Sequence, residues 1–388
     1  MTSAADPLAA AKALRPLIES EANTTDRELT PTKPVVEALS DSMLFHLMVP
    51  KEFGGLEADP DTVLDVFEEL SHQDGSIGWT HMANASATAY SALLEPARAR
   101  EMVADKPGSV FAGQFAPRGG AKRTDGGFRV QGSFGFGSGS AHASFVGGGG
   151  FVTGDDGSPE ILPSGLPAYL CWFVSKDAVE MTGGWDVMGL RGTGSFDYTV
   201  PEQQVDEGRT FWLFESQVRT GGPIYRVGPV GLAGFGHAGW GLGVAQRALD
   251  EIEKIASEGR TRMTGGALKD QQVFQREFGE KVLALRSVRL LVHDLFGRTV
   301  DRLAAGETMS KPMQDDLMAC VAYMTQVCQD ATLFAYNAAG SHGLRNPSLL
   351  QRCFRDMYTG GQHIFVDRKS YEELAMGHLG IEPGGPLG

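Results

Sequence analysis

KEFGGLEADPDTVLDVFEELSHQDGSIGW, residues 51–79, contains a helical pattern and the start of a second one. Between Thr62 and His72 the apolar residues recur every three or four positions, as on one face of a helix. These positions are Val63, Val66, Phe67 and Leu70. The segment Ser76–Leu94 is rich in Ala and Ser, whose small side chains allow close packing. The sequence therefore predicts two consecutive helices here.

The residues before this stretch are also expected to be helical. Asp6-Pro7 has the form of a helix cap followed by proline in the first turn. Apolar residues from Val35 to Leu47 recur at helical spacing and stop at Val49-Pro50. Residues 6 to about 105 thus form a helical region.

The pattern changes near Pro107 to one typical of β-strands. From Phe128 to Phe136, large and mostly small or polar residues alternate, which is the period of a half-buried strand. Three further candidate strands are separated by Gly, Asp, Pro and Ser. They are Ser144–Val152, Ala168–Val174 and Phe196–Val200.

From about Gly228 the helical period returns, and three long helical patterns follow, over residues 239–259, 270–306 and 313–340, each ending at glycine. They predict an up-and-down bundle. Their apolar faces are broader than one bundle can cover, which favours self-association. The fold class is α+β, with a helical domain (1–108), a β domain that is barrel-like (109–220) and a four-helix bundle domain (221–388).

Composition excludes several kinds of partner. The net charge of −14 disfavours binding to nucleic acids and anionic membrane surfaces, because proteins bind these mainly through Lys and Arg. No apolar run approaches the roughly 20 residues of a membrane span, and the N-terminus lacks a signal layout. The four cysteines are widely spaced and are expected to be packing residues of a reduced, cytoplasmic protein.

The glycine clusters do not have the context of nucleotide-binding loops. Gly135–Gly139 and Gly189–Gly194 are bracketed by strands, so no helix N-terminus is present to receive a phosphate. They would instead let a flat ligand approach the main chain. The nine histidines form no H-E-x-x-H or other metal motif, and no metal site is expected.

Six blocks in order resemble the acyl-CoA dehydrogenase superfamily. They are residues 51–79 quoted above, VFAGQFAP (110–117), FRVQGSFGFGSGSAHASF (128–145), WDVMGLRGTGSFDYTV (185–200), GLGVAQRALDEI (241–252) and LLQRCFRDMYTGGQHIF (349–365). The resemblance covers nearly the whole chain and implies an acyl-CoA dehydrogenase-like fold. Within the superfamily, the chain is similar to the two-component flavin-dependent monooxygenases of group D, the aromatic hydroxylases.

The positions where a dehydrogenase holds its catalytic glutamate carry no acid here. Eight residues after Asp356 stands Ile364, and the alternative position on the first bundle helix is Ala233. The resemblance therefore implies an oxygenase rather than a dehydrogenase. Such a protein would take reduced FMN or FAD from a separate NAD(P)H-dependent flavin reductase, and a C4a-hydroperoxide formed with O2 would hydroxylate an aromatic or other electron-rich small molecule. Relatives of this type pack as homotetramers.

The resemblance implies two catalytic residues, His363 and Ser138. His363 is expected to accept the proton of a phenolic substrate, because an imidazole can do so near neutral pH. Ser138 is expected to lie near flavin N5, where a hydroxyl can donate and accept hydrogen bonds. The alternatives are a packing histidine and a turn serine. Arg355-Asp356 is expected to be a structural ion pair.

Further residues are implied in binding. Phe115, Ala116, Phe136, Gly137 and Ser138 would line the isoalloxazine. Arg260 would meet the flavin phosphate from a neighbouring subunit, which suits a guanidinium. Trp79, His81 and His142 would lie on the substrate side, although each also fits ordinary packing.

Three other functions stay open on the sequence alone. A dehydrogenase that desaturates a thioester would need a base from elsewhere. A non-catalytic or nucleic-acid-binding relative would need a basic surface, which the net charge opposes. An N- or S-oxygenase on the same fold would need no base for a phenol, and His363 would then be dispensable.

Overall fold

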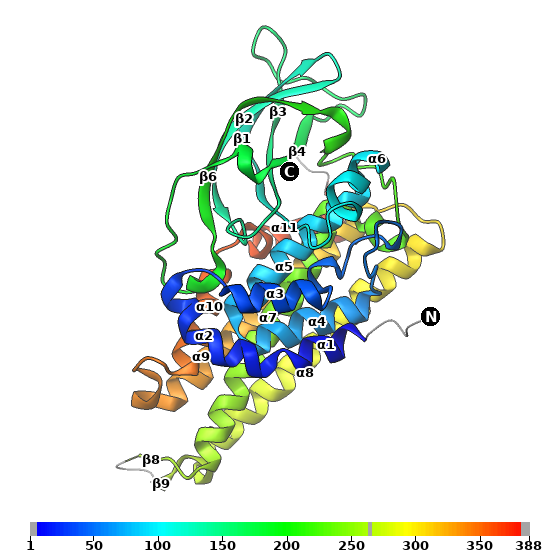
Figure 1. Ribbon diagram of the computed structural model, residues 1–388. Helices are drawn as coiled ribbons and strands as arrows, with labels where there is room; N and C mark the ends of the chain where they lie inside the picture. Colours follow the sequence, from blue (N-terminus) through cyan, green and yellow to red (C-terminus); the bar gives the residue numbers. More distant parts are fainter. Residues whose placement is uncertain (1–5, 263–265, 382–388) are drawn as a thin grey trace.

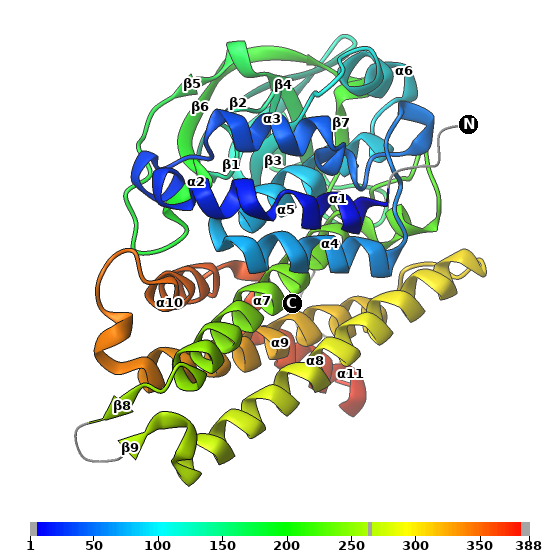
Figure 2. The same ribbon diagram turned by 60° about the horizontal axis from the view of Figure 1, so that its bottom comes forward.

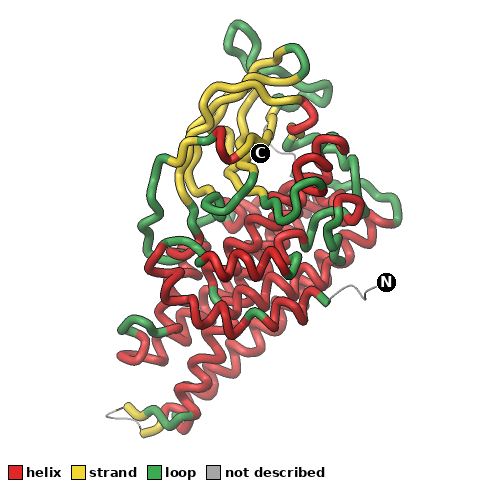
Figure 3. The backbone as a smooth tube through the Cα atoms, viewed as in Figure 1, coloured by secondary structure: helices red, strands yellow, loops and turns green. Residues whose placement is uncertain are grey.

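The computed structural model describes residues 6–262 and 266–381 and has three parts (Figures 1 and 3). Helices form the first part, a curved sheet the second and a bundle of long helices the third. The helices of the first part are α1 (Pro7–Ala13), α2 (Arg15–Glu28), α3 (Lys33–Asp41), α4 (Pro60–Gln73), α5 (Gly75–Ala89) and α6 (Pro96–Ala99). The cap expected at Asp6 is confirmed, since its carboxylate accepts the Leu8 N–H at 3.0 Å.

The helix expected from Val35 to Leu47 is shorter than the pattern indicated. Helix α3 ends at Asp41, Met43 is left-handed at φ 61°, and only a 3-10 turn follows over Leu44–His46. Several of its apolar residues are nevertheless buried, among them Val35, Leu39, Leu44 and Leu47. Their spacing reflects burial, while the left-handed residue stops the helix.

The sheet has seven strands in the order β5-β6-β2-β1-β3-β4-β7. The strands are β1 (Phe111–Thr124), β2 (Gly127–Gly137), β3 (Phe145–Val152), β4 (Tyr169–Ser175), β5 (Glu180–Met181), β6 (Phe196–Asp206) and β7 (Thr210–Trp212). Neighbouring strands are antiparallel except β1 and β3, which are parallel. The four expected strands are present, and the sheet also contains β1 at its centre and the short strands β5 and β7 at its edges.

The long helices of the third part match the expected ones closely, and α7 begins at Gly228, where the helical period was expected to return. They are α7 (Gly228–Ser257), α8 (Gln272–Ala304) and α9 (Lys311–Ala339), followed by α10 (Leu349–Gly360) and α11 (Lys369–Leu379). A small hairpin of β8 (Thr261–Arg262) and β9 (Gly266–Ala267) joins α7 to α8 at the end of the bundle remote from the sheet (Figures 1 and 2). The domain bounds 1–108, 109–220 and 221–388 stay predictions, and the sheet lies within the second of them.

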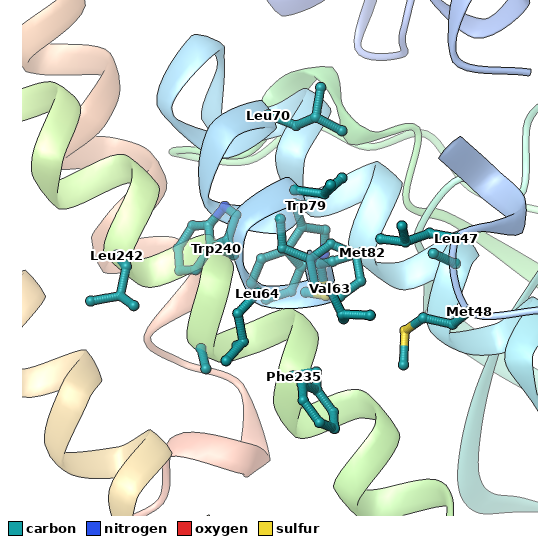
Figure 4. Close-up of a cluster of buried hydrophobic side chains, with 14 of the residues drawn as sticks. Leu47, Met48, Val63, Leu64, Leu70, Trp79, Met82, Phe235, Trp240 and Leu242 are labelled. Atoms are coloured by element: carbon teal, nitrogen blue, oxygen red, sulfur yellow. The ribbon is translucent and has the colours of Figure 1, made fainter. Parts of the chain in front are cut away.

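Helix α5 lies where the three parts meet and is buried along nearly its whole length. It contacts α4 and α7 on one side and β1 on the other. Figure 4 shows Trp79 and Met82 of α5 beside Trp240 and Phe235 of α7. Because α5 is enclosed, any side chain it directs inward is held by neighbours from more than one part of the fold.

A buried polar cluster joins α10 to the other two parts. Asp356 accepts the N–H of Leu190, in the loop before β6, at 2.6 Å. Arg352 donates to Asp74, which caps α5, at 3.3 Å. Arg355 donates to Asp26 of α2 at 3.3 Å. Arg355 and Asp356 are therefore structural, as expected, but they bind different partners, so the expected ion pair between them is wrong.

Burial, together with the negative charge of Asp74, raises the pKa of Asp356 to about 7. Its Oδ2 is buried without a hydrogen-bond partner, which suits a protonated carboxyl. The group thus binds a proton in the folded chain at pH values where an unfolded aspartate, with a pKa of about 3.9, has lost it. Its stabilising contribution is present at low pH and is lost as the pH rises through about 7.

We predict that Asp356→Asn changes the pH dependence of stability. The amide can still accept from Leu190 and cannot ionise, so the variant should gain on the unsubstituted protein by roughly 1 kcal/mol per pH unit between pH 4 and 7. Chemical unfolding at several pH values measures this. An equal difference in stability at pH 5 and pH 8 would contradict it.

All four cysteines are buried and unpaired, as expected of packing residues. Within residues 6–262 and 266–381, no helix combines the length and the apolarity that crossing a membrane requires.

Candidate functional site

Trp79 of α5 is the centre of a group of side chains drawn from all three parts. Its indole N–H donates to the hydroxyl of Ser138, just after β2, at 3.0 Å. Its ring is edge-on to Trp240 and His237 of α7, at centroid distances of 4.9 and 5.2 Å. The ring of His363, which follows α10, lies at 5.8 Å. Sequence-predicted Trp79, Ser138 and His363 are therefore brought together.

Glycine at position 360 allows this group to form. A Cβ on Gly360 would overlap the ring of Trp240 and lie 2.8 Å from the ring of Trp79. The end of α10 can thus approach both indoles only without a side chain there. His363 follows three residues later, which places its ring against the same face.

Ser138 is part of a series of hydroxyls. Its Oγ lies 2.8 Å from the Oγ of Ser195, which lies 2.6 Å from the Oγ1 of Thr193. Thr193 in turn donates to the carbonyl of Leu190 at 2.9 Å. Ser138 is half-buried, whereas Ser195 and Thr193 are buried. Ser138 is therefore the member that a ligand can reach.

Two irregular strand segments meet at Tyr198: Gln114 of β1 donates to its hydroxyl, and Gly137, next to Ser138, lies against its ring. The register of β1 with β3 shifts between Gly113 and Pro117, and that of β2 with β6 shifts between Phe134 and Gly137. Phe136 is left-handed at φ 60° and its ring is 60% exposed. Bulges and positive-φ residues of this kind cluster at binding sites because they redirect the chain.

These segments fit a flat ring system. Residues 114–116 are half-buried, and the buried side-chain oxygen of Gln114 has no hydrogen-bond partner. The exposed Phe136 side chain and the half-buried Ser138 add an apolar ring and a hydroxyl to this part of the surface. A flavin, planar and polar at its edge, matches this surface.

The other residues expected to line the isoalloxazine, namely Phe115, Ala116 and Gly137, differ in which of their atoms a ligand can contact. The ring of Phe115 packs inward against Tyr90 and Phe173, at centroid distances of 5.3 and 5.5 Å, so only its main chain is placed as expected. Ala116 is half-buried. Gly137 is buried, and a Cβ there would lie 2.8 Å from the Tyr198 ring, so glycine is required for packing.

His363 is half-buried and neutral at ordinary pH. Burial lowers its pKa to about 4. Its Nδ1 accepts the N–H of Phe365 at 3.3 Å, and its ring is stacked on that of Phe365 at 5.2 Å. Because Nδ1 accepts, the neutral ring carries its proton on Nε2, which is therefore a donor.

His237 is a member of the group that the sequence did not reveal. Its ring lies 4.4 Å from that of His363, and it is buried in α7. Burial, and then the proximity of His363, lower its pKa well below the ordinary value. A signal was present: His237 is one helical turn after Ala233, the position that was considered for a catalytic acid.

The remaining substrate-side candidates, His81 and His142, form hydrogen bonds with other groups. His81 is fully buried; its Nε2 bonds the carbonyl of Leu44 at 2.8 Å and burial lowers its pKa to about 4. His142 bonds the side-chain oxygen of Asn84 at 3.0 Å, and burial, followed by the charge of Lys176, likewise lowers its pKa to about 4. Both histidines are uncharged at neutral pH, and the structure does not bring His81 to the group around Trp79.

Arg260 lies at the remote end of the bundle. It follows α7, and a Cβ on Gly340 would lie 2.9 Å from its guanidinium. Ser138 binds Trp79, which packs on Trp240, and from Trp240 to its end at Ser257 α7 runs for about 26 Å, so within one chain Arg260 is far from Ser138. The role that the resemblance implies for Arg260, at the flavin phosphate of a neighbouring subunit, stays a prediction.

No carboxylate takes the place of a dehydrogenase base at the two positions considered. Ile364 is 80% exposed and Ala233 is on α7. Among the described residues, no group of three or more His, Cys, Asp or Glu side chains is arranged to hold a metal ion. The donors at the site are thus hydroxyl, indole, imidazole and main-chain groups.

Comparisons with known proteins agree with this architecture. Residues 9–97 match the model of the acyl-CoA dehydrogenase N-terminal domain, and residues 235–368 match that of the C-terminal domain. XiaF from a Streptomyces species, solved with FADH2 and glycerol, superposes with a TM-score of 0.89 at 22% identity, covering 99% of this chain and 97% of that one. The last match establishes the fold.

Two curated relatives match over nearly their whole length. The chain is 31% identical to indole-3-acetate monooxygenase of Pseudomonas putida over 361 residues, 92% of this chain and 90% of the relative. It is 26% identical to the oxygenase subunit HsaA, a flavin-dependent monooxygenase of Mycobacterium tuberculosis, over 97% of this chain and 96% of the relative.

Proposed function

Because the chain belongs to the flavin-dependent monooxygenases of the acyl-CoA dehydrogenase superfamily, we propose that it hydroxylates an aromatic small molecule at the site around Trp79. The observation that carries this is the convergence of aromatic rings beside the Ser138 hydroxyl. The rings belong to Trp79, His237, His363 and Phe365.

The cofactor is a reduced flavin. When bound, it would supply the two electrons that reduce O2, so that one oxygen atom of O2 enters the substrate and the other leaves as water. Phe136 and the main chain of residues 114–116 would hold the ring, and Ser138 would meet its polar edge. A separate NAD(P)H-dependent reductase would supply the reduced form, as FMN or FAD.

Aromatic residues favour an aromatic substrate, because offset and edge-on ring contacts add to apolar burial. The relative named for indole-3-acetate has a substrate of this class. A planar ring, such as an indole or a phenol, would therefore lie between the flavin face and His363. An N- or S-oxygenated compound of similar shape is the alternative outcome.

The proposal is tested by reconstitution. The protein, a flavin reductase, NADH, flavin and ¹⁸O2 are mixed with a panel of indoles, phenols, aryl amines and aryl sulfides. One ¹⁸O atom in the product would support a monooxygenase, and its position would distinguish C- from N- or S-oxygenation. Reduction of the flavin by an acyl-CoA without oxygen incorporation would overturn the proposal in favour of a dehydrogenase.

We further propose that His363 acts on the substrate oxygen as a hydrogen-bond donor. Its pKa of about 4 makes it a weak base, and its Nδ1 is engaged by the Phe365 N–H. The available Nε2–H can stabilise the negative charge that a phenol oxygen gains as the ring is attacked. The role of base, expected from the sequence, would require the Nδ1 contact to break or the ring proton to move.

His363→Ala and His363→Gln distinguish the two roles. A lost hydrogen bond to a charged oxygen should lower the product rate by roughly 10- to 150-fold in His363→Ala. Glutamine retains a donor and should recover part of the rate. Loss of a general base would instead lower the product rate by about 10²- to 10⁴-fold, and His363→Gln would then be no faster than His363→Ala. Product formation at saturating reduced flavin measures this.

The pH dependence gives an independent prediction. Since the ring stays in its neutral form well above its pKa of about 4, product formation per bound flavin should be level from pH 6 to pH 8. A rate that falls between pH 7.5 and pH 6, and does so in the unsubstituted protein but not in His363→Ala, would contradict the low pKa.

We also propose a homotetramer formed through the helical bundles. Helix α8 exposes several large apolar side chains along its length, namely Val273, Leu283 and Leu290. Covering this face with another chain would bury it, and could place Arg260 at the flavin phosphate of that chain. Light scattering at micromolar concentration should report four chains, and a monomer would contradict the proposal.

A further inference from the structure

The hydroxyls at the site form a continuous chain of hydrogen bonds between the Trp79 indole N–H and the Leu190 carbonyl oxygen. Trp79 Nε1 is 3.0 Å from Ser138 Oγ, and Ser138 Oγ is 2.8 Å from Ser195 Oγ. Ser195 Oγ is 2.6 Å from Thr193 Oγ1, and Thr193 Oγ1 is 2.9 Å from the Leu190 oxygen. Ser195 and Thr193 are 2% and 0% exposed, so water does not offer them alternative partners.

The two ends determine the direction of every bond between them. An indole N–H can only donate, a carbonyl oxygen can only accept, and a hydroxyl has a single proton. Thr193 uses its proton on the Leu190 carbonyl, so the proton between Thr193 and Ser195 belongs to Ser195. By the same step, the proton between Ser195 and Ser138 belongs to Ser138.

Ser138 can consequently form only one kind of hydrogen bond with a ligand. Its proton points to Ser195, and one lone pair receives the Trp79 N–H. The second lone pair is its only remaining hydrogen-bonding capacity. Toward the half-buried side that a ligand can reach, Ser138 is an acceptor.

We propose that Ser195 and Thr193 are positioning residues that make the site select reduced over oxidised flavin. This rests on the proposed function, in which the flavin edge near N5 meets Ser138. N5 of a reduced flavin carries a hydrogen and donates, which matches an acceptor. N5 of an oxidised flavin has only a lone pair, which faces the lone pair of Ser138.

Accommodating oxidised flavin would disrupt the series. If Ser138 turned its proton to N5, Ser195 would have to donate to Ser138 or leave two oxygens in contact without a proton. If the whole series reversed, Thr193 would lose the Leu190 carbonyl. Either change costs one buried hydrogen bond, which corresponds to a preference of roughly 2- to 12-fold for the reduced form.

Two variants remove the constraint and one retains it. Ser195→Ala frees the Ser138 proton directly. Thr193→Val, of nearly equal volume, removes the acceptor of Ser195, so that Ser195 can turn and release Ser138. Thr193→Ser keeps the hydroxyl and is the matched control. The Leu190 carbonyl is not orphaned in these variants, because the Trp185 indole N–H also donates to it, at 2.7 Å.

The experiment measures dissociation constants for oxidised and anaerobically reduced FMN and FAD, and the reduction potential of the bound flavin. The unsubstituted protein and Thr193→Ser should prefer the reduced form. In Ser195→Ala and Thr193→Val the ratio of the two constants should fall by roughly 2- to 12-fold, and the potential should move toward that of free flavin.

Other results would contradict either this inference or the proposed function on which it rests. Equal weakening of both flavin forms in the two variants, or an unchanged ratio, would overturn the inference and leave Ser195 and Thr193 as packing residues. Tighter binding of oxidised flavin by the unsubstituted protein would also overturn it. Failure to bind either form would instead refute the proposed function, on which the inference rests.

Discussion

The close approach of α4, α5 and α7 is the constraint on which the rest of the structure depends. Glycines of α7 lie directly against the other two helices: a Cβ on Gly239 would be 2.5 Å from the Cβ of Phe67, and one on Gly236 would be 2.8 Å from the sulfur of Met82. Without side chains at these positions, the helix axes can approach closely enough to enclose α5. A single methyl group would separate them, and the contact between Trp79 and Trp240 would be lost with it.

The regular elements could be predicted because their apolar faces are long. Helices such as α8 and α9 repeat their burial pattern over about 30 residues, so local spacing is sufficient. Strand β1 was not recognised as a strand, since its irregular segment is held by distant groups. The Gln114 N–H donates to the hydroxyl of Tyr198 at 2.7 Å, and the hydroxyl of Tyr169 donates to the carbonyl of Phe115. No local pattern contains these contacts.

The site was predicted in part, and for a similar reason. Trp79, Ser138 and His363 lie in sequence blocks that resemble a known family, and the structure brings them together. Ser195 and His237 belong to the site only through contacts with residues distant in the sequence. Ser195 bonds to Ser138, 57 residues away, and His237 contacts His363, 126 residues away. His81 could have been set aside from helix geometry alone, because residues two apart are rotated by about 200° and point to opposite sides.

The site works with neutral groups whose protons have fixed positions. Burial lowers the pKa of both His363 and His237, so neither ring is charged at neutral pH. The ion pair of Arg352 and Asp74 lies among buried residues at the start of α5, where it orients α10 and not the ligand. A neutral site of defined polarity distinguishes molecules by where they carry hydrogen, whereas a titrating site distinguishes them by charge. Reduced and oxidised flavin differ in this respect at N5, as a phenol differs from an aryl ether at its oxygen. The same arrangement of fixed donors and acceptors can therefore select both the cofactor and the substrate.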